Sequence, residues 1–162
     1  MPFLYSKNSA NVNYMAKIII GCDHAGFPLK ETIRQYLENL GYNITDVGTD
    51  SGDPVDYPDF GAQVAERVSS GEFDKGILLC GSGVGMAIVA NKFPHIRAVT
   101  CLDEETARMS RLHNDTNILV LAGRRTEKDA AKSITHLWLS TEFEGDRHQR
   151  RIDKIEAIEK RV

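Results

Sequence analysis

Short apolar runs alternate with stretches in which apolar residues recur every three or four positions, and this alternation limits the possible folds more than any other feature. Runs of the first kind are typical of strands, and stretches of the second kind are typical of amphipathic helices. Five strand-then-helix units in this order predict an α/β fold, a doubly wound domain with a five-stranded, mostly parallel sheet. The strand-like runs are residues 16–22, 42–48, 75–80, 96–101 and 117–123. The helical patterns are residues 27–41, 57–71, a segment from the glycines at 81–85 to Pro94, and then 103–115, 126–140 and 147–162.

The length and charge of the chain exclude several classes of protein. At 162 residues the chain suits one domain, which we place at residues 15–162. A net charge of −3 gives no overall attraction to nucleic acid, so any anion site must be local. No apolar run approaches the length of a membrane span, so we expect neither nucleic acid nor membrane as a partner. Residues 1–14 are polar and irregular, and we expect them to be a disordered or loosely ordered extension.

The three cysteines, Cys22, Cys80 and Cys101, are odd in number and far apart in the sequence. This spacing matches neither a disulfide framework nor a zinc-binding motif, so we expect free thiols and no metal. Free thiols persist in a reducing compartment, and we therefore expect a cytoplasmic protein.

Ligands of doubly wound sheets bind beyond the carboxyl ends of the strands. The residues that directly follow the predicted strands are therefore the first candidates for a functional site, and several titratable side chains should share this edge of the sheet. These residues are Asp23 and His24, Gly48 onward, the glycine-rich stretch after Cys80, residues 101–103, and Gly123 with Arg124.

The stretch CGSGVG, residues 80–85, connects a predicted strand to a predicted helix. Gly81, Gly83 and Gly85 are spaced by two, which does not fit the dinucleotide-binding fingerprint, and no Walker-type Gly-Lys-Ser/Thr follows. Asp103 lies about as far downstream as a ribose-binding acid would, which leaves a nucleotide-binding interpretation open. Such a loop can direct backbone N–H groups toward an anion or a developing oxyanion. The alternative is a tight turn that needs glycine for packing alone.

Cys80 lies between the third predicted strand and this loop. A cysteine in that position is either a small buried apolar residue or a reactive thiol that the helix N-terminus makes more acidic. Asp23 and His24 directly follow the first strand, where a ligand-binding role competes with a helix N-cap and a solvated histidine. We expect Cys22 and Cys101 to be structural, because no glycine loop follows either of them.

His113 has the most promising position of the five histidines. It ends a predicted helix just before a strand, in the sequence His-Asn-Asp. A turn there could aim its imidazole at the edge of the sheet where the other candidates lie. We expect His95, His136 and His148 to be structural or solvent-facing.

The last predicted helix carries a basic face. Arg147 and Arg151 are four residues apart and therefore lie on the same side of the helix. Two guanidinium groups so placed suit a phosphate, and the alternative is a solvated basic helix end. Beyond them Ile152, Ile155 and Ile158 form a narrow apolar stripe, so we expect this helix to pack on a partner subunit.

Segments at every predicted strand end resemble the type B ribose-5-phosphate isomerases, within the wider family of ribose/galactose sugar-phosphate isomerases. These segments are GCDHAGFPLK, GTDS with DYPDF, GILLCGSGVGMAIVANKFPHIRA, RLHNDTNILVLAGR and EGDRHQRRI. The resemblance covers residues 16–161 and implies a Rossmann-like sheet in a homodimer or homotetramer, with the active site at the subunit interface. It implies an aldose–ketose isomerase that interconverts D-ribose 5-phosphate and D-ribulose 5-phosphate through an enediolate, without metal or cofactor. Its place would be the non-oxidative pentose phosphate pathway.

The same resemblance implies roles for individual residues, some of them supplied by the partner chain. Cys80 would be the base that moves the proton between C1 and C2, and Ser82 would donate a hydrogen bond to the enediolate oxygen. His113 would open the furanose ring, with Tyr57 close by. The other implied positions are Gly81, Gly83, Val84 and Gly85 in the loop, Asp23 and Asn114 for substrate hydroxyls, and His24, Arg124, Arg147 and Arg151 for the phosphate.

Two other functions remain open from the sequence. One is the same chemistry on a hexose 6-phosphate. The other is a nucleotide-binding sensor that uses the loop 81–85, although this function would leave His113, Arg147 and Arg151 without a role.

Overall fold

The computed structural model describes residues 15–162, and the predicted N-terminal extension, residues 1–14, lies outside the described residues. Each strand and helix falls within the range that the sequence pattern predicts. The strands are β1 (Ile18–Cys22), β2 (Ile44–Asp46), β3 (Lys75–Cys80), β4 (Ala98–Thr100) and β5 (Ile118–Ala122). The helices are α1 (Phe27–Asn39), α2 (Tyr57–Ser69), α3 (Val84–Ala90), α4 (Glu104–Asn114), α5 (Lys128–Ser140) and α6 (Arg147–Glu159). Within residues 15–162, no helix combines the length and the apolar character needed to cross a bilayer.

The five strands are all parallel and lie in the order β2-β1-β3-β5-β4. The predicted doubly wound, Rossmann-like sheet is therefore confirmed. The chain runs outward from β1 to β2 and then returns to β3 on the other side of β1. This reversal is the switch point at which such sheets leave room for a ligand. The ladder pairs Cys22 with Leu79 and Cys80 with Ala122, so three neighbouring strands end at the same level.

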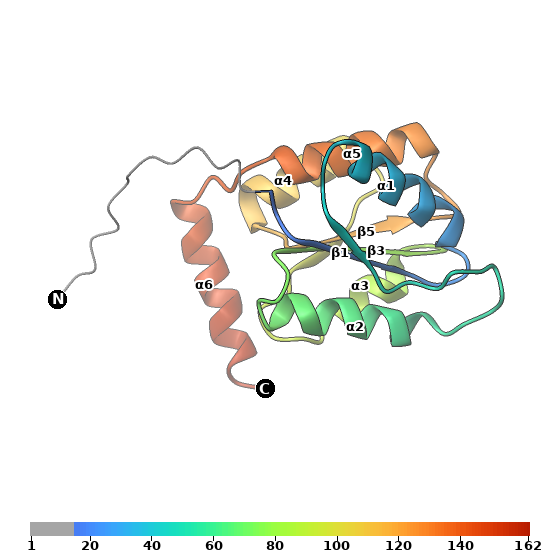
Figure 1. The fold of residues 1–162 in the computed structure, drawn as a ribbon. Coiled ribbons are helices and arrows are strands. Elements are labelled where there is room, and N and C mark those ends of the chain that lie inside the picture. Colours follow the sequence, from blue (N-terminus) through green and yellow to red (C-terminus); the bar gives the residue numbers. More distant parts are fainter. Residues whose placement is uncertain (1–14) are drawn as a thin grey trace.

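Helices cover both faces of this sheet (Figure 1). Helices α1, α4 and α5 pack on one face, and α2 and α3 pack on the other. Successive residues of β1 point into opposite layers: Ile18 and Ile20 belong to the first core, and Ile19 belongs to the second. Because β1, β3 and β5 are buried on both sides, their sequences are continuous apolar runs rather than alternating ones.

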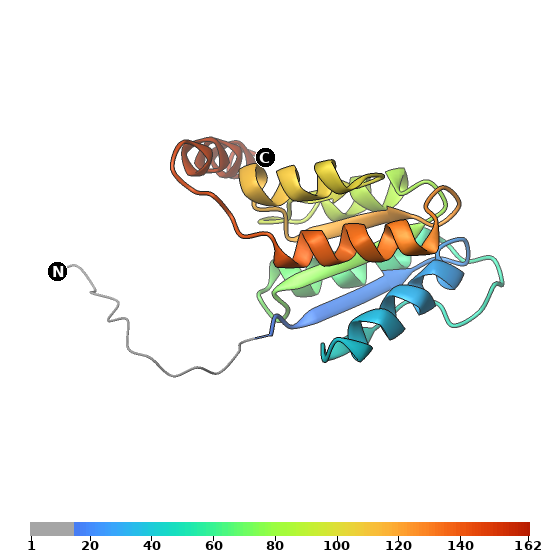
Figure 2. The same cartoon turned by 90° about the horizontal axis from the view of Figure 1, so that it is seen from above.

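Helix α6 lies apart from these two layers, beside α4 and the end of the sheet at which the strands begin (Figures 1 and 2). The turn that leads into it contains two residues with positive φ, Gly145 at 77° and Asp146 at 49°. Of the predicted apolar stripe, Ile152 is buried, whereas Ile155 and Ile158 are 48% and 58% exposed. Two of the three isoleucines of the stripe are therefore exposed.

Ile33 tests the core that joins α1 to the sheet, because its side chain is fully buried there. The Ile33→Ala variant should lose about 2–5 kcal/mol of unfolding free energy, since the removed methyl groups leave a cavity. Leu40 follows the same helix and is 45% exposed, so Leu40→Ala should change the value by less than about 0.5 kcal/mol. Denaturant titration followed by circular dichroism measures both. Equal losses in the two variants would contradict this assignment of the core.

Candidate active site

A cavity of about 470 Å³ opens at the carboxyl ends of β1, β3 and β5. It lies at the switch point of the sheet, where ligands of open α/β sheets bind. Because loops from three strands converge here, side chains that are distant in the sequence share one space. The lining residues are Asp23, His24, Ala25, Tyr57, Cys80, Gly81, Ser82, Val84, Gly85, Ile88 and Arg124.

The sulfur of Cys80 lies where this cavity meets the core. The residue is only 4% exposed and packs in the α2–α3 layer, yet it also lines the cavity. Its Sγ accepts a hydrogen bond from the N–H of Gly83 at 3.2 Å. This donor comes from the glycine loop that follows the strand. Cys80 is thus both a buried small residue and a thiol with a donor aimed at it.

The loop 81–85 holds its shape through contacts that need glycine. Gly83 has a φ of 78°, and an added Cβ would lie 2.7 Å from Cγ2 of Thr100. The hydroxyl of Thr100 donates to the Gly83 carbonyl at 3.0 Å, which fixes the loop to β4. The Val84 N–H donates to Oγ of Ser82 at 3.2 Å. The amides of Gly83 and Val84 therefore point at Sγ and Oγ.

Asp23 and His24 are held in place by backbone amides. Helix α1 has Gly26 as its N-cap, so the interpretation of Asp23 as the cap of this helix is wrong. Instead, Oδ1 of Asp23 accepts the Gly26 N–H at 2.9 Å within the turn after β1. Nδ1 of His24 accepts the Val55 N–H at 3.2 Å, which leaves the proton of the neutral ring on Nε2.

Tyr57 and Arg124 approach the loop over two of its glycines. Tyr57 packs so closely on Gly85 that an added Cβ would lie 2.6 Å from Cζ of the ring. The Arg124 guanidinium lies over Gly81, where an added Cβ would lie 3.2 Å from Nη1. Glycine is therefore needed for packing, and that packing brings an aromatic ring and a cation to the cavity that Cys80 lines.

The remaining candidates near the carboxyl edge have structural roles. Burial raises the pKa of the Cys22 and Cys101 thiols to about 12, so both are protonated at neutral pH. Asp103 caps α4, with Oδ1 accepting the Thr106 N–H at 2.7 Å. Because its carboxylate closes a helix, Asp103 is not placed as the ribose-binding acid that a nucleotide site would need.

The second half of the predicted site lies at the other end of the sheet. His113 precedes the amino end of β5, whereas Cys80 pairs with Ala122, the last residue of that strand. A five-residue strand spans about 16 Å, so the two groups do not meet within one chain. The expectation that the turn after α4 aims His113 at the carboxyl edge is therefore wrong. The residues at this far end are His113 and Asn114 of α4 and Arg147 and Arg151 of α6.

His113 belongs to a cluster that the sequence analysis did not identify. Its ring stacks on that of His148, with centroids 4.1 Å apart and planes inclined by 13°. Oε2 of Glu144 lies 3.8 Å from Nε2 of each histidine. His148 is buried rather than solvent-facing, and burial lowers its pKa. The four-residue spacing of Glu144 and His148 is the one sequence signal for this cluster, since His113 is remote in sequence.

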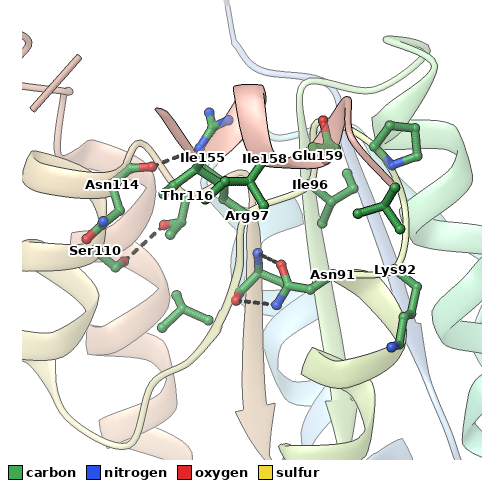
Figure 3. A pocket seen from close by; sticks show the side chains of 14 residues that line it. Asn91, Lys92, Ile96, Arg97, Ser110, Asn114, Thr116, Ile155, Ile158 and Glu159 are labelled. Carbon is green, nitrogen blue, oxygen red and sulfur yellow. Dashed lines mark hydrogen bonds between the residues drawn. The ribbon is translucent and has the colours of Figure 1, made fainter. Parts of the chain in front are cut away.

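A larger cavity, of about 800 Å³, lies between α6 and the β4 edge of the sheet. Figure 3 shows Ile155 and Ile158 of α6 among its lining, together with Ile96. Polar side chains here bind other protein groups: Asn91 exchanges two hydrogen bonds with the backbone of Ala98, and Ser110 bonds Thr116. This groove suits an apolar protein surface better than a charged substrate.

Comparison with known proteins identifies close relatives of the whole described domain. The model of the ribose/galactose isomerase family matches residues 18–155. The chain is 49% identical over 147 residues to ribose-5-phosphate isomerase B of Escherichia coli (strain K12). That match covers 91% of this chain and 99% of the relative.

Solved structures agree with this match. Ribose-5-phosphate isomerase B of Clostridium thermocellum is similar at a TM-score of 0.88 and 52% identity, over 90% of this chain and 98% of that one. The enzyme of the same name from Mycoplasma genitalium, solved with bound ribulose-5-phosphate, has a TM-score of 0.87 at 40% identity. The latter match covers 90% of this chain and 97% of that one.

Thiol alkylation tests the different surroundings of the three cysteines. In the native protein at neutral pH, iodoacetamide should modify Cys80 alone, because Cys80 lines a cavity, whereas Cys22 and Cys101 are fully buried and protonated. Mass spectrometry should find a single adduct on the native chain, none on Cys80→Ala, and all three cysteines modified after denaturation. A native adduct on Cys22 or Cys101 would contradict the assignment.

Proposed function

The chain belongs to the ribose/galactose isomerase family, and we propose that it interconverts D-ribose 5-phosphate and D-ribulose 5-phosphate. The observation that carries this proposal is the position of Cys80, whose Sγ accepts the Gly83 N–H beside a cavity at the switch point. Aldose–ketose isomerisation moves a proton between neighbouring carbons and needs a base at a fixed position. The reaction belongs to the non-oxidative pentose phosphate pathway. The cytoplasm, where thiols stay reduced, suits the three free cysteines.

In the proposed reaction the Cys80 thiolate takes the proton from C2 of open-chain ribose 5-phosphate and delivers it to C1. An enediolate forms between the two transfers, and the hydroxyl proton of O2 passes to O1 as the ketone forms. The enediolate oxygen needs hydrogen-bond donors. Oγ of Ser82 already accepts the Val84 N–H, so its own O–H is the group available to donate. We assign the other contacts to the N–H groups of Ser82 and Gly85, because the Gly83 amide points at Sγ. Losing one donor of this kind typically costs about 100- to 1000-fold in rate.

In this proposal, residues from both ends of the sheet bind the hydroxyls and the phosphate of the substrate. Asp23, His24 and Arg124 line the cavity, and we assign Asp23 to a substrate hydroxyl and His24 and Arg124 to the phosphate. One arginine balances only part of a phosphate dianion. The exposed Arg147 and Arg151 of α6 would supply the remaining positive charge through charge-assisted hydrogen bonds.

We infer that a second copy of the chain completes each site. A two-fold dimer that sets the α4–α6 end of one chain over the cavity of the other completes both sites at once. His113 and Asn114 of one chain then reach the sugar bound beside Cys80 of its partner, and His113 opens the ring. A homotetramer of two such dimers would keep the same sites.

Exposed apolar side chains on both halves support this assembly. Beside the cavity, Val84 and Ile88 are 58% and 57% exposed. At the other end Ile155 and Ile158 border the 800 Å³ groove. Exposed apolar surface of this kind marks interaction sites. A partner that covers it would also exclude water from the reacting carbons.

A hexose 6-phosphate is the second candidate substrate, because the matching family includes galactose isomerases. The chemistry would be unchanged, and only the length of the sugar would differ. The presence of the base, the ring-opening histidine and the phosphate-binding arginines in one chain favours the five-carbon sugar. A nucleotide sensor is not proposed, because Asp103 caps a helix.

Replacing the base tests the proposed reaction. Cys80→Ala should lower kcat/KM for ribose 5-phosphate by about 100-fold or more, measured as ribulose 5-phosphate formed. Cys101→Ala removes a cysteine outside the cavity and should keep turnover near that of the unmodified chain. Near-normal turnover by Cys80→Ala would show that Cys80 is not the base. If the unmodified chain turned over allose 6-phosphate faster than ribose 5-phosphate, the substrate would be a hexose 6-phosphate instead.

Mixing two inactive variants tests the shared site. Cys80→Ala and His113→Asn chains should each be inactive toward ribose 5-phosphate as homodimers. Random re-pairing makes half of the dimers mixed, and each mixed dimer has one intact site of two. Activity should therefore return to about one quarter of the normal value. Sites formed within single chains would give no recovery, and sedimentation of the mixture separates dimers from tetramers.

A further inference from the structure

His113, Glu144 and His148 form the one group of histidine, cysteine and acidic side chains in residues 15–162 that could jointly hold a metal ion. Their ligand atoms all lie within 4.8 Å of one another. We propose that this cluster binds a divalent transition-metal ion such as Zn²⁺ and that the bound ion inhibits the enzyme by withdrawing His113 from ring opening. Inhibition rests on the proposed function, whereas metal binding does not.

The buried imidazole of His148 is the strongest reason to expect a ligand here. Its side chain is only 4% exposed, and among the described residues its Nε2 has no hydrogen-bond partner. A buried polar atom without a partner costs free energy that a bound ion would recover. This Nε2 faces Oε2 of Glu144 at 3.8 Å, so a nitrogen and a carboxylate oxygen already point into the same space.

The backbone holds the three ligands together without the metal. The Glu144 N–H donates to the Leu112 carbonyl at 3.1 Å, which ties the connection before α6 to the end of α4. The His148 N–H donates to the Gly145 carbonyl at 3.0 Å. The two carboxylate oxygens of Glu144 face different partners. Oε1 lies 3.9 Å from Nη1 of Arg147, and Oε2 faces the imidazoles. One oxygen therefore faces both histidines.

Only a modest rearrangement separates this cluster from a zinc site. Tetrahedral zinc holds its nitrogen and oxygen ligands about 3.3 Å apart, compared with 3.8 Å for each Nε2–Oε2 pair here. Two stacked rings cannot both direct an in-plane lone pair at one ion. Because His113 is 31% exposed and His148 is buried, His113 is the ring that turns out of the stack. Three protein ligands leave a fourth position for water.

Two features of this cluster limit how tightly it should bind a metal ion. Arg147 lies beside Glu144 and opposes a second cation at the same carboxylate. The site also lacks thiolate ligands, which strengthen structural zinc sites. Binding should therefore be reversible and removable by a chelator rather than permanent.

The consequence for activity depends on the direction of the reaction. Ribose 5-phosphate closes into a furanose and must be opened before its C2 proton can be removed. Ribulose 5-phosphate stays open, because its C5 oxygen carries the phosphate. A metal ion that holds His113 should therefore inhibit the consumption of ribose 5-phosphate more strongly than the consumption of ribulose 5-phosphate.

Calorimetric titration of the full chain with Zn²⁺ tests binding without any assay of activity. The unmodified chain, His136→Asn and Cys80→Ala should each bind one ion per chain, since His136 is an exposed histidine on α5. Glu144→Gln and His148→Asn should each weaken binding by about tenfold or more. Glu144 is 42% exposed, so Glu144→Gln keeps the test valid even if the buried His148 variant folds poorly. Unchanged binding by Glu144→Gln, or binding lost in Cys80→Ala, would overturn the proposal.

Initial rates in the two directions test the inhibition. Zn²⁺ should slow ribose 5-phosphate consumption more than ribulose 5-phosphate consumption in the unmodified chain and in His136→Asn, and a chelator should restore both rates. Equal inhibition of both directions would place the effect on Cys80 and overturn the assigned mechanism. A chain without isomerase activity would refute the proposed function while the calorimetric test of the metal site still stands.

Discussion

The parallel ladder that joins β1, β3 and β5 is the constraint on which the candidate site depends. It brings the ends of three strands to one level, so that the residues after each strand become neighbours. Asp23, Cys80 and Arg124 are far apart in sequence and meet only because of this register. A slip of one residue in β3 would turn Cys80 toward the opposite helical layer and break the contact between Sγ and the Gly83 amide.

The architecture could be derived from the sequence because its three central strands, β1, β3 and β5, are buried on both faces. Continuous apolar runs such as Ile18–Cys22 and Ile118–Ala122 stand out from helical stretches, and alternation of the two kinds leaves few topologies. The same reasoning predicted that Asp23, Cys80 and Arg124 lie together at the carboxyl ends of the strands, where they line one cavity. It failed for His113, because a residue that precedes a parallel strand lies at the amino edge whatever turn follows it. The conformation of a turn can change the direction of a side chain, but it cannot carry that side chain along a whole strand to the other end of the sheet.

Contacts between distant segments were beyond sequence reasoning for a different physical cause. Val55 fixes the ring of His24, and Thr100 fixes the carbonyl of Gly83. Nothing in the sequence around Val55 or Thr100 indicates these contacts. The Tyr57 ring lies on Gly85 because the glycine has no Cβ, which a spacing rule for anion loops does not reveal. His148 was expected among the unremarkable histidines, although its burial and its stack on His113 make it part of a cluster. Side-chain partners of this sort are set by tertiary packing.

The two outermost strands, β2 and β4, contain only three residues each. At about 10 Å each, they offer an incoming strand very few unpaired backbone groups. Extension of the sheet by strands of other chains at β2 or β4 is therefore unfavourable, and so is fibre-like stacking of chains. In the proposed dimer, the subunits would recognise one another through helices and connecting loops, which also carry His113, Arg147 and the loop after Cys80. In such a dimer, changes that tune recognition between copies would alter the chemistry as well, so assembly and turnover would not evolve independently.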